Sequence, residues 1–307
     1  MTGAPGDAPS RPQHAGPEAP AAEALNVHFH QLAGLRELAR RGTLTEAAAA
    51  LHVTQPALSQ SLAQLERRVG VALLERDGRR RRLTEAGQEL ARFAEETLGR
   101  AAELQRWLLA HRAGESGTLR VGMIDAASLY FLPGTIREFR AAHPAVQLRL
   151  LVADSAALLR RLQGFELDLA FVVGPVEGEF ESAAVAREPL HLYAPPGASE
   201  QPQQGAWVLY PAGSRTRTLI DEGLERLGMQ PQVILESSNP EVLRQMVSLG
   251  LCWSVLPPGV AEDGAAPLAP YRREAVAERV LVGVRRRGAP PDERAEAFLG
   301  LARRAQR

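Results

Sequence analysis

The stretch His52–Gly70, HVTQPALSQSLAQLERRVG, has the apolar spacing of a helix but carries a proline close to its start. Thr54 precedes Pro56 by two residues, and threonine is a frequent N-cap. Proline is tolerated in the first helical turn, where its missing N–H has no intrahelical partner. We therefore predict a helix that starts directly after Thr54, with Pro56 in its first turn.

This helix is predicted to have an apolar and a polar face. Helical spacing places on the inner face Ala57, Leu58, Leu62, Leu65 and Val69. The polar residues left to point outward are Gln55, Ser59, Gln60 and Gln64. Amide and hydroxyl groups suit the base edges of a DNA major groove, where glutamine pairs with adenine through two hydrogen bonds. The outer face therefore predicts a helix that reads DNA.

Two shorter helical segments precede this helix. Apolar residues recur at helical spacing over 27–41, and Gly42 ends that segment. Thr43 or Thr45 is expected to cap a second helix over 46–51, and a tight turn follows it. Two short helices, a tight turn and a third helix with a polar face predict a helix-turn-helix.

A basic segment follows the third helix. Asp77-Gly78 is a hairpin turn signal, and four arginines come directly after it: Arg79, Arg80, Arg81 and Arg82. A solvated surface is the ordinary explanation of an arginine run, but the adjoining helix-turn-helix favours contact with phosphates or a minor groove. Residues 26–84 contain ten arginines and five acidic residues, although the whole chain has no net charge. We therefore predict a wing that contacts DNA.

The composition argues against several other classes of protein. No apolar run approaches the roughly 20 residues of a membrane-spanning helix, and we recognise no secretory signal. The single cysteine, Cys252, excludes a disulfide framework, and its apolar neighbours favour a buried thiol over a redox sensor. The histidines show no metal-ligand spacing, and we expect no cofactor. A cytoplasmic location is predicted, and residues 1–25, rich in proline, alanine and glycine, are predicted to be a disordered tail.

The segment 85–113 is predicted to be one long helix capped by Thr84. A coiled-coil-like seam follows steps of four and three through Leu90, Ala94, Thr97, Ala101, Leu104 and Leu108. A long helix with a narrow apolar stripe favours a partner helix from another subunit, and packing on its own domain is the alternative. A dimer would also present two helix-turn-helix units to two half-sites on double-stranded DNA.

Strands and helices alternate after residue 117, in two successive series. This alternation predicts parallel sheets that are covered by helices on both faces. Two series suggest two lobes with a cleft between them, which is a usual place for a small ligand.

The segment Leu44–Gly87, LTEAAAALHVTQPALSQSLAQLERRVGVALLERDGRRRRLTEAG, resembles the signature of the LysR-type transcriptional regulators. Later motifs occur in family order: LRVGM, FELDLAFVVGP, APPGA, PAGSRTR and GLCWSVLP. The resemblance covers nearly all of residues 26–306. It implies a winged helix-turn-helix over 26–84, a dimerising linker helix over 85–113 and a two-lobed α/β effector domain over 118–306, similar to periplasmic binding proteins.

The resemblance also implies a mode of action. Members of the family regulate nearby promoters, usually as tetramers built from dimers, and an inducer in the cleft changes DNA bending. Because the family's chain crosses between lobes twice, we place lobe I at 118–190 and 283–306, and lobe II at 191–282. The expected partners are double-stranded DNA, a small-molecule effector, further copies of the chain and, as a candidate, RNA polymerase. No membrane partner is expected.

Site residues follow from the resemblance by position. Thr54, Gln55, Pro56, Ser59 and Gln60 match the start of the family's recognition helix, and the arginine run matches its wing. The family's effector pocket lies at helix N-termini, which here correspond to Asp125, Ala126, Ala127 and Ser128 in lobe I and to Ser214, Arg215, Thr216 and Asn239 in lobe II. Free N–H groups and the helix dipole make such positions receptive to anions. Arg215 would add a clamp for a carboxylate or phosphate.

Two features of lobe I depart from the family pattern. Ile124 and Ala126 stand where many relatives have serine or threonine, so the pocket offers fewer hydroxyl groups. Asp125 places a negative charge near the expected anion site. Capping of the following helix is the favoured explanation. The alternatives are that Asp125 pairs with Arg215 or that it selects a ligand with an amino group.

An enzyme is the main alternative class of protein. Ser214 with His191 and an aspartate would be needed for a triad, but no Gly-x-Ser-x-Gly elbow surrounds Ser214. No Walker or dinucleotide fingerprint occurs either, so we expect no catalytic activity. A solute-binding protein would match 118–306 alone. A regulator that lacks a small-molecule effector remains a further alternative.

Overall fold

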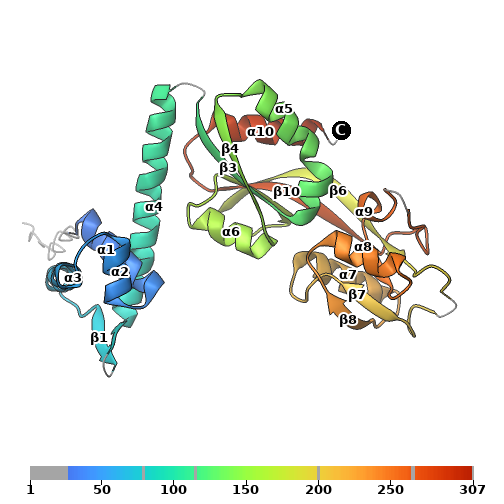
Figure 1. Ribbon diagram of the computed structural model, residues 1–307, viewed down its shortest axis with the longest axis horizontal. Coiled ribbons are helices and arrows are strands. Elements are labelled where there is room, and N and C mark those ends of the chain that lie inside the picture. The colour runs from blue at the N-terminus through green and yellow to red at the C-terminus, as the bar shows by residue number, and fades with distance from the viewer. Residues whose placement is uncertain (1–26, 78–79, 114–115, 199–200, 264–266, 306–307) are drawn as a thin grey trace, which may run out of the picture. The chain divides into compact units, whose positions relative to one another are not determined.

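The computed structural model describes residues 27–77, 80–113, 116–198, 201–263 and 267–305. The chain divides into two compact units, with the boundary between Leu98 and Gly99 (Figure 1). Helix α4 (Glu85–Ala113) therefore contributes residues to both units. The predicted disordered tail, together with Gly78 and Arg79 of the predicted wing, lies outside the described residues.

The first unit is a helical head with a two-stranded hairpin. Its elements are α1 (Phe29–Arg41), α2 (Leu44–Ala50), α3 (Gln55–Val69), β1 (Leu74–Asp77), β2 (Arg80–Leu83) and the beginning of α4. The Oγ1 atom of Thr43 accepts the Glu46 N–H at 3.2 Å, which settles the cap of α2. The predicted cap of α3 is confirmed, because Thr54 Oγ1 accepts the Ala57 N–H at 3.4 Å. Pro56 lies in the first turn of α3, as predicted.

The core of the head consists mainly of leucines from α1 and α3. Its fully buried members include Leu35, Leu38, Leu58, Leu62 and Leu65. Burial of each side chain contributes about 1.5–3 kcal/mol relative to exposure. The prediction that Ala57 packs inward is wrong, because Ala57 is exposed. The helical repeat places it roughly 100° around α3 from the buried leucine stripe.

Helix α4 starts in close contact with the head. Thr84 Oγ1 accepts the Gly87 N–H at 3.0 Å, so the predicted cap is confirmed. A Cβ atom on Gly87 would lie 2.2 Å from the carbonyl oxygen of Leu73, which leaves no room for a side chain there. The later part of α4 belongs to the second unit, and there Gly99 lies against the ring of Phe165. No helix in the described part of the chain is long and apolar enough to cross a membrane.

A six-stranded sheet with the order β4-β3-β5-β10-β6-β9 forms the centre of the second unit. Its strands are β3 (Gly117–Met123), β4 (Val146–Val152), β5 (Leu169–Gly174), β6 (Phe180–Tyr193), β9 (Ser254–Leu256) and β10 (Ala277–Arg286). β3, β4 and β5 are parallel, but β10 is antiparallel to both β5 and β6. The expectation of purely parallel sheets is therefore wrong. The chain leaves lobe I along β6 and returns along β10, which gives these neighbours opposite directions.

Two hydrophobic cores divide the second unit into two lobes. Lobe I contains η1 (Ala127–Phe131), α5 (Pro133–Ala142), α6 (Ser155–Gln163) and α10 (Glu293–Arg304), with α6 on the opposite face of the sheet from α5 and α10 (Figure 1). Lobe II contains β7 (Ala206–Leu209), α7 (Arg215–Arg226), β8 (Gln232–Glu236), α8 (Pro240–Ser248) and α9 (Pro258–Ala261). β6 and β10 contribute residues to both cores and so connect the lobes. The predicted boundaries at 190 and 282 fall within these two strands.

Candidate functional site

The outer face of α3 is polar and accessible. Gln55, Gln60 and Gln64 are exposed, and Ser59 is half-buried. Thr54 and Pro56 at the start of the helix are exposed as well. All six residues predicted to contact DNA from this helix are therefore at least partly accessible, while the leucine stripe of α3 holds the helix on the head.

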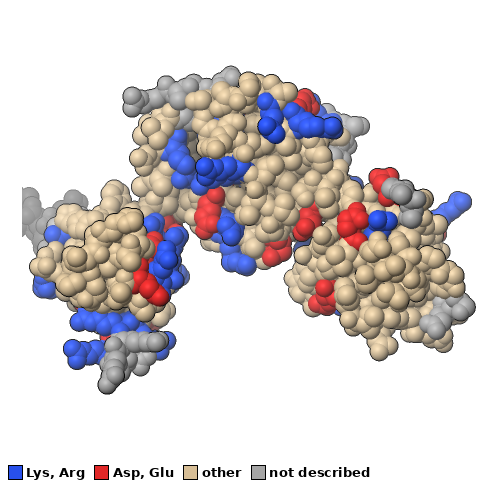
Figure 2. Space-filling view, in the orientation of Figure 1, with Lys and Arg blue, Asp and Glu red and all other residues tan. Residues whose placement is uncertain are grey.

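The β1–β2 hairpin carries basic residues next to this helix in sequence. Its strands are antiparallel, and Asp77 is opposite Arg80, as expected for the predicted wing. Arg81 and Arg82 are exposed. A groove of about 540 Å³ beside the hairpin has among its lining residues Arg36, Arg40, Arg81, Arg82, Arg92 and Glu95. Figure 2 shows basic side chains gathered over this end of the head. The groove therefore offers a basic surface to an anionic backbone.

A cavity of about 520 Å³ lies between the two lobes of the second unit. Lobe I lines it with Ile124, Asp125, Ala126, Ala153, Asp154, Ser155, Ala156, Leu159, Val173, Pro175 and Val176. Lobe II lines it with Tyr210, Pro211, Ala212, Gly213, Ser214, Arg215, Thr216 and Ser238, and β10 adds Arg279. The lining segments follow the carboxyl ends of β3, β4, β5 and β7, which is where ligands bind in open α/β sheets.

The cavity brings together most of the residues predicted for the effector. The predicted residues that line it are Asp125, Ala126, Ser214, Arg215 and Thr216. Ala127 is fully buried in the core of lobe I and does not line the cavity. Ser128 donates its Oγ–H to the Asp125 carbonyl at 2.8 Å. Asn239 caps α8 by accepting the Glu241 N–H at 2.9 Å, and its neighbour Ser238 lines the cavity in its place.

The first turn of α7 provides hydrogen-bond donors at the cavity. Ser214 caps the helix, because its Oγ accepts the Arg217 N–H at 3.3 Å. The first-turn N–H groups of a helix have no intrahelical partner, and here Arg215 and Thr216 lie in that turn. Arg215 is exposed and forms no ion pair with any residue that the structure describes. Helix dipole and guanidinium together favour an anionic group at this end of the cavity.

Asp125 is a half-buried carboxylate at the opposite wall. The predicted cap is wrong, because the following element is a π-helical turn whose N-cap is Ala126, without a side-chain cap. The Ser128 N–H bonds to the Ile124 carbonyl at 3.1 Å, so Asp125 lies within the first helical turn and not at the cap position before it. No ion pair joins Asp125 to Arg215. Burial raises the pKa of Asp125, and a hydrogen bond from its own backbone N–H opposes this shift.

A buried ion pair forms the inner wall of the cavity. The Nε atom of Arg279 on β10 lies 2.6 Å from Oε2 of Glu188 on β6, and its Nη1 donates to Thr216 Oγ1 at 3.4 Å. The guanidinium lies 5.7 Å from the ring centroid of Tyr210. The Tyr210 Oη atom is buried, and no described residue accepts a hydrogen bond from it. Because burial raises the pKa of Tyr210, its hydroxyl stays protonated and is available as a donor.

Sequence reasoning missed the residues of this inner wall. Glu188 and Arg279 are charged residues within strands that lie largely in the core, and a buried charge needs a partner. That signal is visible in the sequence. The pairing is not, because 91 residues separate the two side chains. Tyr210 follows a strand directly and carries no signal that distinguishes it from a core tyrosine.

The rival chemistries find little support in the geometry. The described residues contain no group of three histidine, cysteine, aspartate or glutamate side chains that could hold a metal ion. Ser214 uses its Oγ to cap α7, and no hydrogen bond among the described residues joins it to His191. Cys252 is 2% exposed, so the predicted burial is confirmed, and this burial raises the pKa of its thiol.

Two family models match the chain. One, described as a bacterial regulatory helix-turn-helix protein of the lysR family, matches residues 29–88, and one described as a LysR substrate binding domain matches residues 112–307. The chain is 33% identical to the HTH-type transcriptional regulator CfxR of Cupriavidus necator, over 71% of this chain and 72% of that protein. It is 31% identical to the uncharacterized HTH-type transcriptional regulator YfeR of Shigella flexneri, over 91% of this chain and 94% of that protein.

A solved structure has a similar fold. Full-length CbnR in complex with its target DNA matches with a TM-score of 0.64 and 22% sequence identity. The match covers 91% of this chain and 100% of CbnR. The order of a helical head, a long helix and a two-lobed domain therefore agrees with that structure.

Proposed function

This chain belongs to the LysR family of bacterial transcriptional regulators, and from that premise we propose which of its residues read DNA and where its effector binds. As a member of the family it is a DNA-binding regulator with a substrate-binding domain, and the family is one of regulators rather than enzymes. A cytoplasmic location belongs to the same proposal.

DNA recognition is assigned to α3 and the wing. The exposed amides of Gln55, Gln60 and Gln64 and the half-buried hydroxyl of Ser59, with Thr54 and Pro56 at the helix start, contact the major groove. The arginines of the wing contact phosphates. This assignment is supported by the accessibility of the α3 face and by the basic groove beside β2.

Effector binding is assigned to the interlobe cavity. The observation that carries the assignment is the convergence of Asp125, Ala126, Ser214, Arg215 and Thr216 on one cavity from segments about 90 residues apart. Its volume of about 520 Å³ lies within the ordinary range for small-molecule sites. An effector that contacts both lobes would favour one arrangement of the lobes over others, which is the thermodynamic requirement for regulation.

Association of copies through α4 completes the proposal. Leu104, Leu108 and Leu109 are each about half exposed on this helix, which leaves an apolar strip available to a second chain. We assign a homodimer to this contact and a tetramer to the pairing of two dimers. Bound at a promoter, such an assembly would be placed to contact RNA polymerase.

The DNA assignment is tested by incubating the full chain with fragmented bacterial genomic DNA at near-physiological salt and sequencing what it retains. We expect discrete peaks near promoters, each over a partly palindromic site. Gln55→Ala should lower the ratio of specific to non-specific affinity by about tenfold, because one good base contact is worth about 1–3 kcal/mol. Smooth coverage without peaks, or an equal loss of both affinities, would contradict the assignment.

The effector assignment is tested by thermal unfolding of the full chain in the presence of a metabolite library. A ligand at about 100 times its Kd stabilises the folded chain by about 2.7 kcal/mol. Ala212→Trp at the exposed rim of the cavity should remove that stabilisation. Glu225→Trp, exposed on α7 but outside the cavity lining, is the matched control. A ligand that is insensitive to Ala212→Trp binds elsewhere, and a library without any binder favours a regulator that lacks an effector.

A further inference from the structure

The two walls of the interlobe cavity differ in charge. The lining residues of lobe I include two carboxylates, Asp125 and Asp154, and no basic residue. Those of lobe II include Arg215 and no acidic residue. Arg279 adds a second guanidinium, whose charge Glu188 balances. A ligand that spans the cavity therefore meets an acidic wall at one end and a basic wall at the other.

The carboxylate of Asp125 has no side-chain partner in the described part of the chain and is bonded by its own backbone N–H. Capping and pairing with Arg215 are both excluded by the geometry, which leaves the third explanation, a ligand with an amino group. Asp154, in contrast, already caps α6 by accepting the Ala157 N–H at 2.8 Å. A half-buried carboxylate without a side-chain partner is unfavourable, and a bound cation would remove that penalty.

The opposite wall is rich in hydrogen-bond donors. Arg215 brings a guanidinium that forms an ion pair with no described residue, and the first turn of α7 brings backbone N–H groups. Tyr210 is 5% exposed and lines the cavity, and no described residue accepts a hydrogen bond from its hydroxyl. Such a group is ordinarily satisfied by protein or by ordered water, and an acceptor atom of a ligand in the cavity would take the place of that water. Donors arranged in this way are suited to an oxyanion such as a carboxylate.

We propose that the effector is a zwitterion of the amino-acid type, with its ammonium group at Asp125 and its carboxylate at Arg215, Tyr210 and the start of α7. This inference rests on the proposed binding of an effector in the interlobe cavity. Leu159, Val173, Pro175 and Val176 also line the cavity, so the ligand carries an apolar side chain. Because its two charged ends contact different lobes, the ligand bridges lobe I and lobe II.

Simpler ligands leave one wall unmatched. A plain anion would satisfy Arg215 and Tyr210 but would place a second negative charge in the same cavity as Asp125. A plain amine would satisfy Asp125 but would leave the hydroxyl of Tyr210 without an acceptor and would add positive charge near Arg215. The zwitterion is the class that complements both walls at once.

The experiment is calorimetric titration of the full chain with three matched sets of compounds. The sets are amino acids with apolar side chains, the corresponding acids without the amino group, and the corresponding amines without the carboxylate. We expect binding by at least one amino acid and much weaker binding by its acid and its amine. Asp125→Asn should lower the affinity for the amino acid by about tenfold, which is the loss expected for one charge-assisted hydrogen bond. It should leave the affinity for the acid without an amino group unchanged.

Further variants separate the two ends of the ligand. Tyr210→Phe should lower the affinities for the amino acid and for the acid by similar factors, because it removes a hydrogen-bond donor to the carboxylate that both ligands carry. Asp221→Asn, on the exposed side of α7 outside the cavity lining, is the matched control and should change neither.

Two failures are distinguishable. If an acid without an amino group, or another metabolite that is not a zwitterion, binds in a manner sensitive to Ala212→Trp, the inference on ligand class is overturned and the effector assignment stands. If neither these sets nor a broad metabolite library contains a compound sensitive to Ala212→Trp, the effector assignment fails and the inference fails with it.

Discussion

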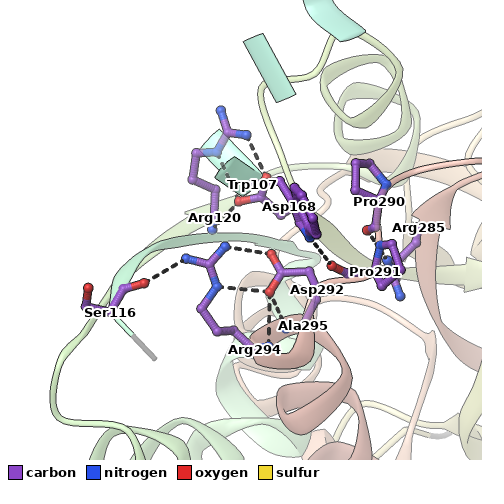
Figure 3. A network of polar contacts seen from close by, with 10 residues as sticks. All are labelled: Trp107, Ser116, Arg120, Asp168, Arg285, Pro290, Pro291, Asp292, Arg294 and Ala295. Carbon is purple, nitrogen blue, oxygen red and sulfur yellow. Dashed lines mark hydrogen bonds and ion pairs between the residues drawn. The ribbon is translucent and has the colours of Figure 1, made fainter. Parts of the chain in front are cut away.

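Asp292 accepts hydrogen bonds both from backbone N–H groups and from a guanidinium at the start of α10 (Figure 3). Its Oδ1 accepts the Arg294 and Ala295 backbone N–H groups at 3.0 and 3.4 Å, which caps the helix. The guanidinium of Arg294 donates to the same carboxylate through Nε at 2.9 Å and Nη2 at 2.8 Å. Arg294 also donates to the Ser116 carbonyl at 3.3 Å, close to the start of β3. One carboxylate therefore fixes α10 and the entry to the sheet.

Asp292→Ala should lower the free energy of unfolding by about 1–2 kcal/mol at neutral pH, because it removes an N-cap and a charged partner. Burial alone would raise the pKa of Asp292, but the bonds from Arg294 and the helix N–H groups hold it below its usual value. The stability from this group is therefore present above the pKa of an unfolded aspartate and is lost as the pH falls through the folded value. Urea unfolding at pH 7 and near pH 3 measures the gap in the free energy of unfolding between wild type and variant, and this gap should become smaller in acid. A gap that stays constant would contradict this account.

Individual site residues differ in how well the sequence predicts them. Ser214 and Arg215 are predictable because a serine before a helix is a local capping signal, and local signals determine where α7 begins. Tyr210 and Arg279 are not predictable, because their role depends on distant strands meeting at one cavity. Asp125 is an intermediate case. Its position in the cavity is predicted, but its capping role fails because the π turn that follows has no signature in the sequence.

The β2 strand carries the basic residues that can be tested within the described part of the wing. Replacing Arg81 and Arg82 by alanine should weaken binding to all DNA sequences and reduce the slope of log K against log salt by up to about 1.8, since each phosphate contact contributes about 0.9. Fluorescence anisotropy across a salt series measures the slope. Arg161→Ala, on the exposed side of α6, is the control and should leave it unchanged. An unchanged slope in the double variant would show that this strand does not contact phosphates.

The second half of α4 has a docked side and a free side. On the docked side, Trp107 Nε1 donates to the Pro291 carbonyl at 3.0 Å (Figure 3), and Glu103 pairs with Arg286. On the free side, Leu104 and Leu108 are 50% and 49% exposed. The helix therefore both packs on its own domain and retains an apolar strip, so the two alternatives raised by its sequence are compatible.

Leu104→Asp with Leu108→Asp should abolish the proposed association through α4, because two charges would face the apolar strip of the partner. Sedimentation analysis over a range of concentrations measures the change. Gln105→Asp, at an exposed neighbouring position, controls for the helix propensity of aspartate, which costs at most about 0.7 kcal/mol per residue. If the association state does not change, the contact between copies lies outside α4.

Elements with strong local signals begin where the sequence predicts. Helices α3 and α4 begin directly after the predicted caps Thr54 and Thr84. β6 is a long strand that extends from Phe180 to Tyr193. In its first half, Phe180 to Ala186, only Val185 is buried, and this half is stabilised by pairing with β10, which a local pattern does not reveal. Strand direction is missed for the same reason.

A side chain links the two lobes in addition to β6 and β10. Tyr130 of η1 packs against both hydrophobic cores. Its hydroxyl donates to Glu241 in the first turn of α8, and Glu241 Oε2 accepts from Arg244 Nε at 3.0 Å. Both ends of this link are close in sequence to residues that line the effector cavity. Ala126 lies four residues before Tyr130, and Ser238 lies three residues before Glu241. It is therefore suited to hold the cavity walls in the arrangement that the structure shows.

Tyr130→Phe should lower the free energy of unfolding by about 1.5–3 kcal/mol, the value of a hydrogen bond to a charged group. Combined with Glu241→Gln in a double-mutant cycle, it should show a coupling above the roughly 0.5 kcal/mol expected of independent sites. The bond from Tyr130 lowers the pKa of Glu241, burial opposes that shift, and Arg244 reinforces it. The coupling should therefore be present above the pKa of an unfolded glutamate and disappear as the pH falls through the folded value.

The same variant separates the arrangement of the lobes from direct ligand contact. Tyr130 does not line the cavity, so Tyr130→Phe removes no contact with a bound molecule. If the bond holds the two walls in register, the variant should still weaken an effector that bridges the lobes, and it should affect an effector held by one lobe much less. Calorimetric titration of wild type and variant measures this difference. An additive cycle together with unchanged affinity would show that β6 and β10 alone determine how the lobes meet.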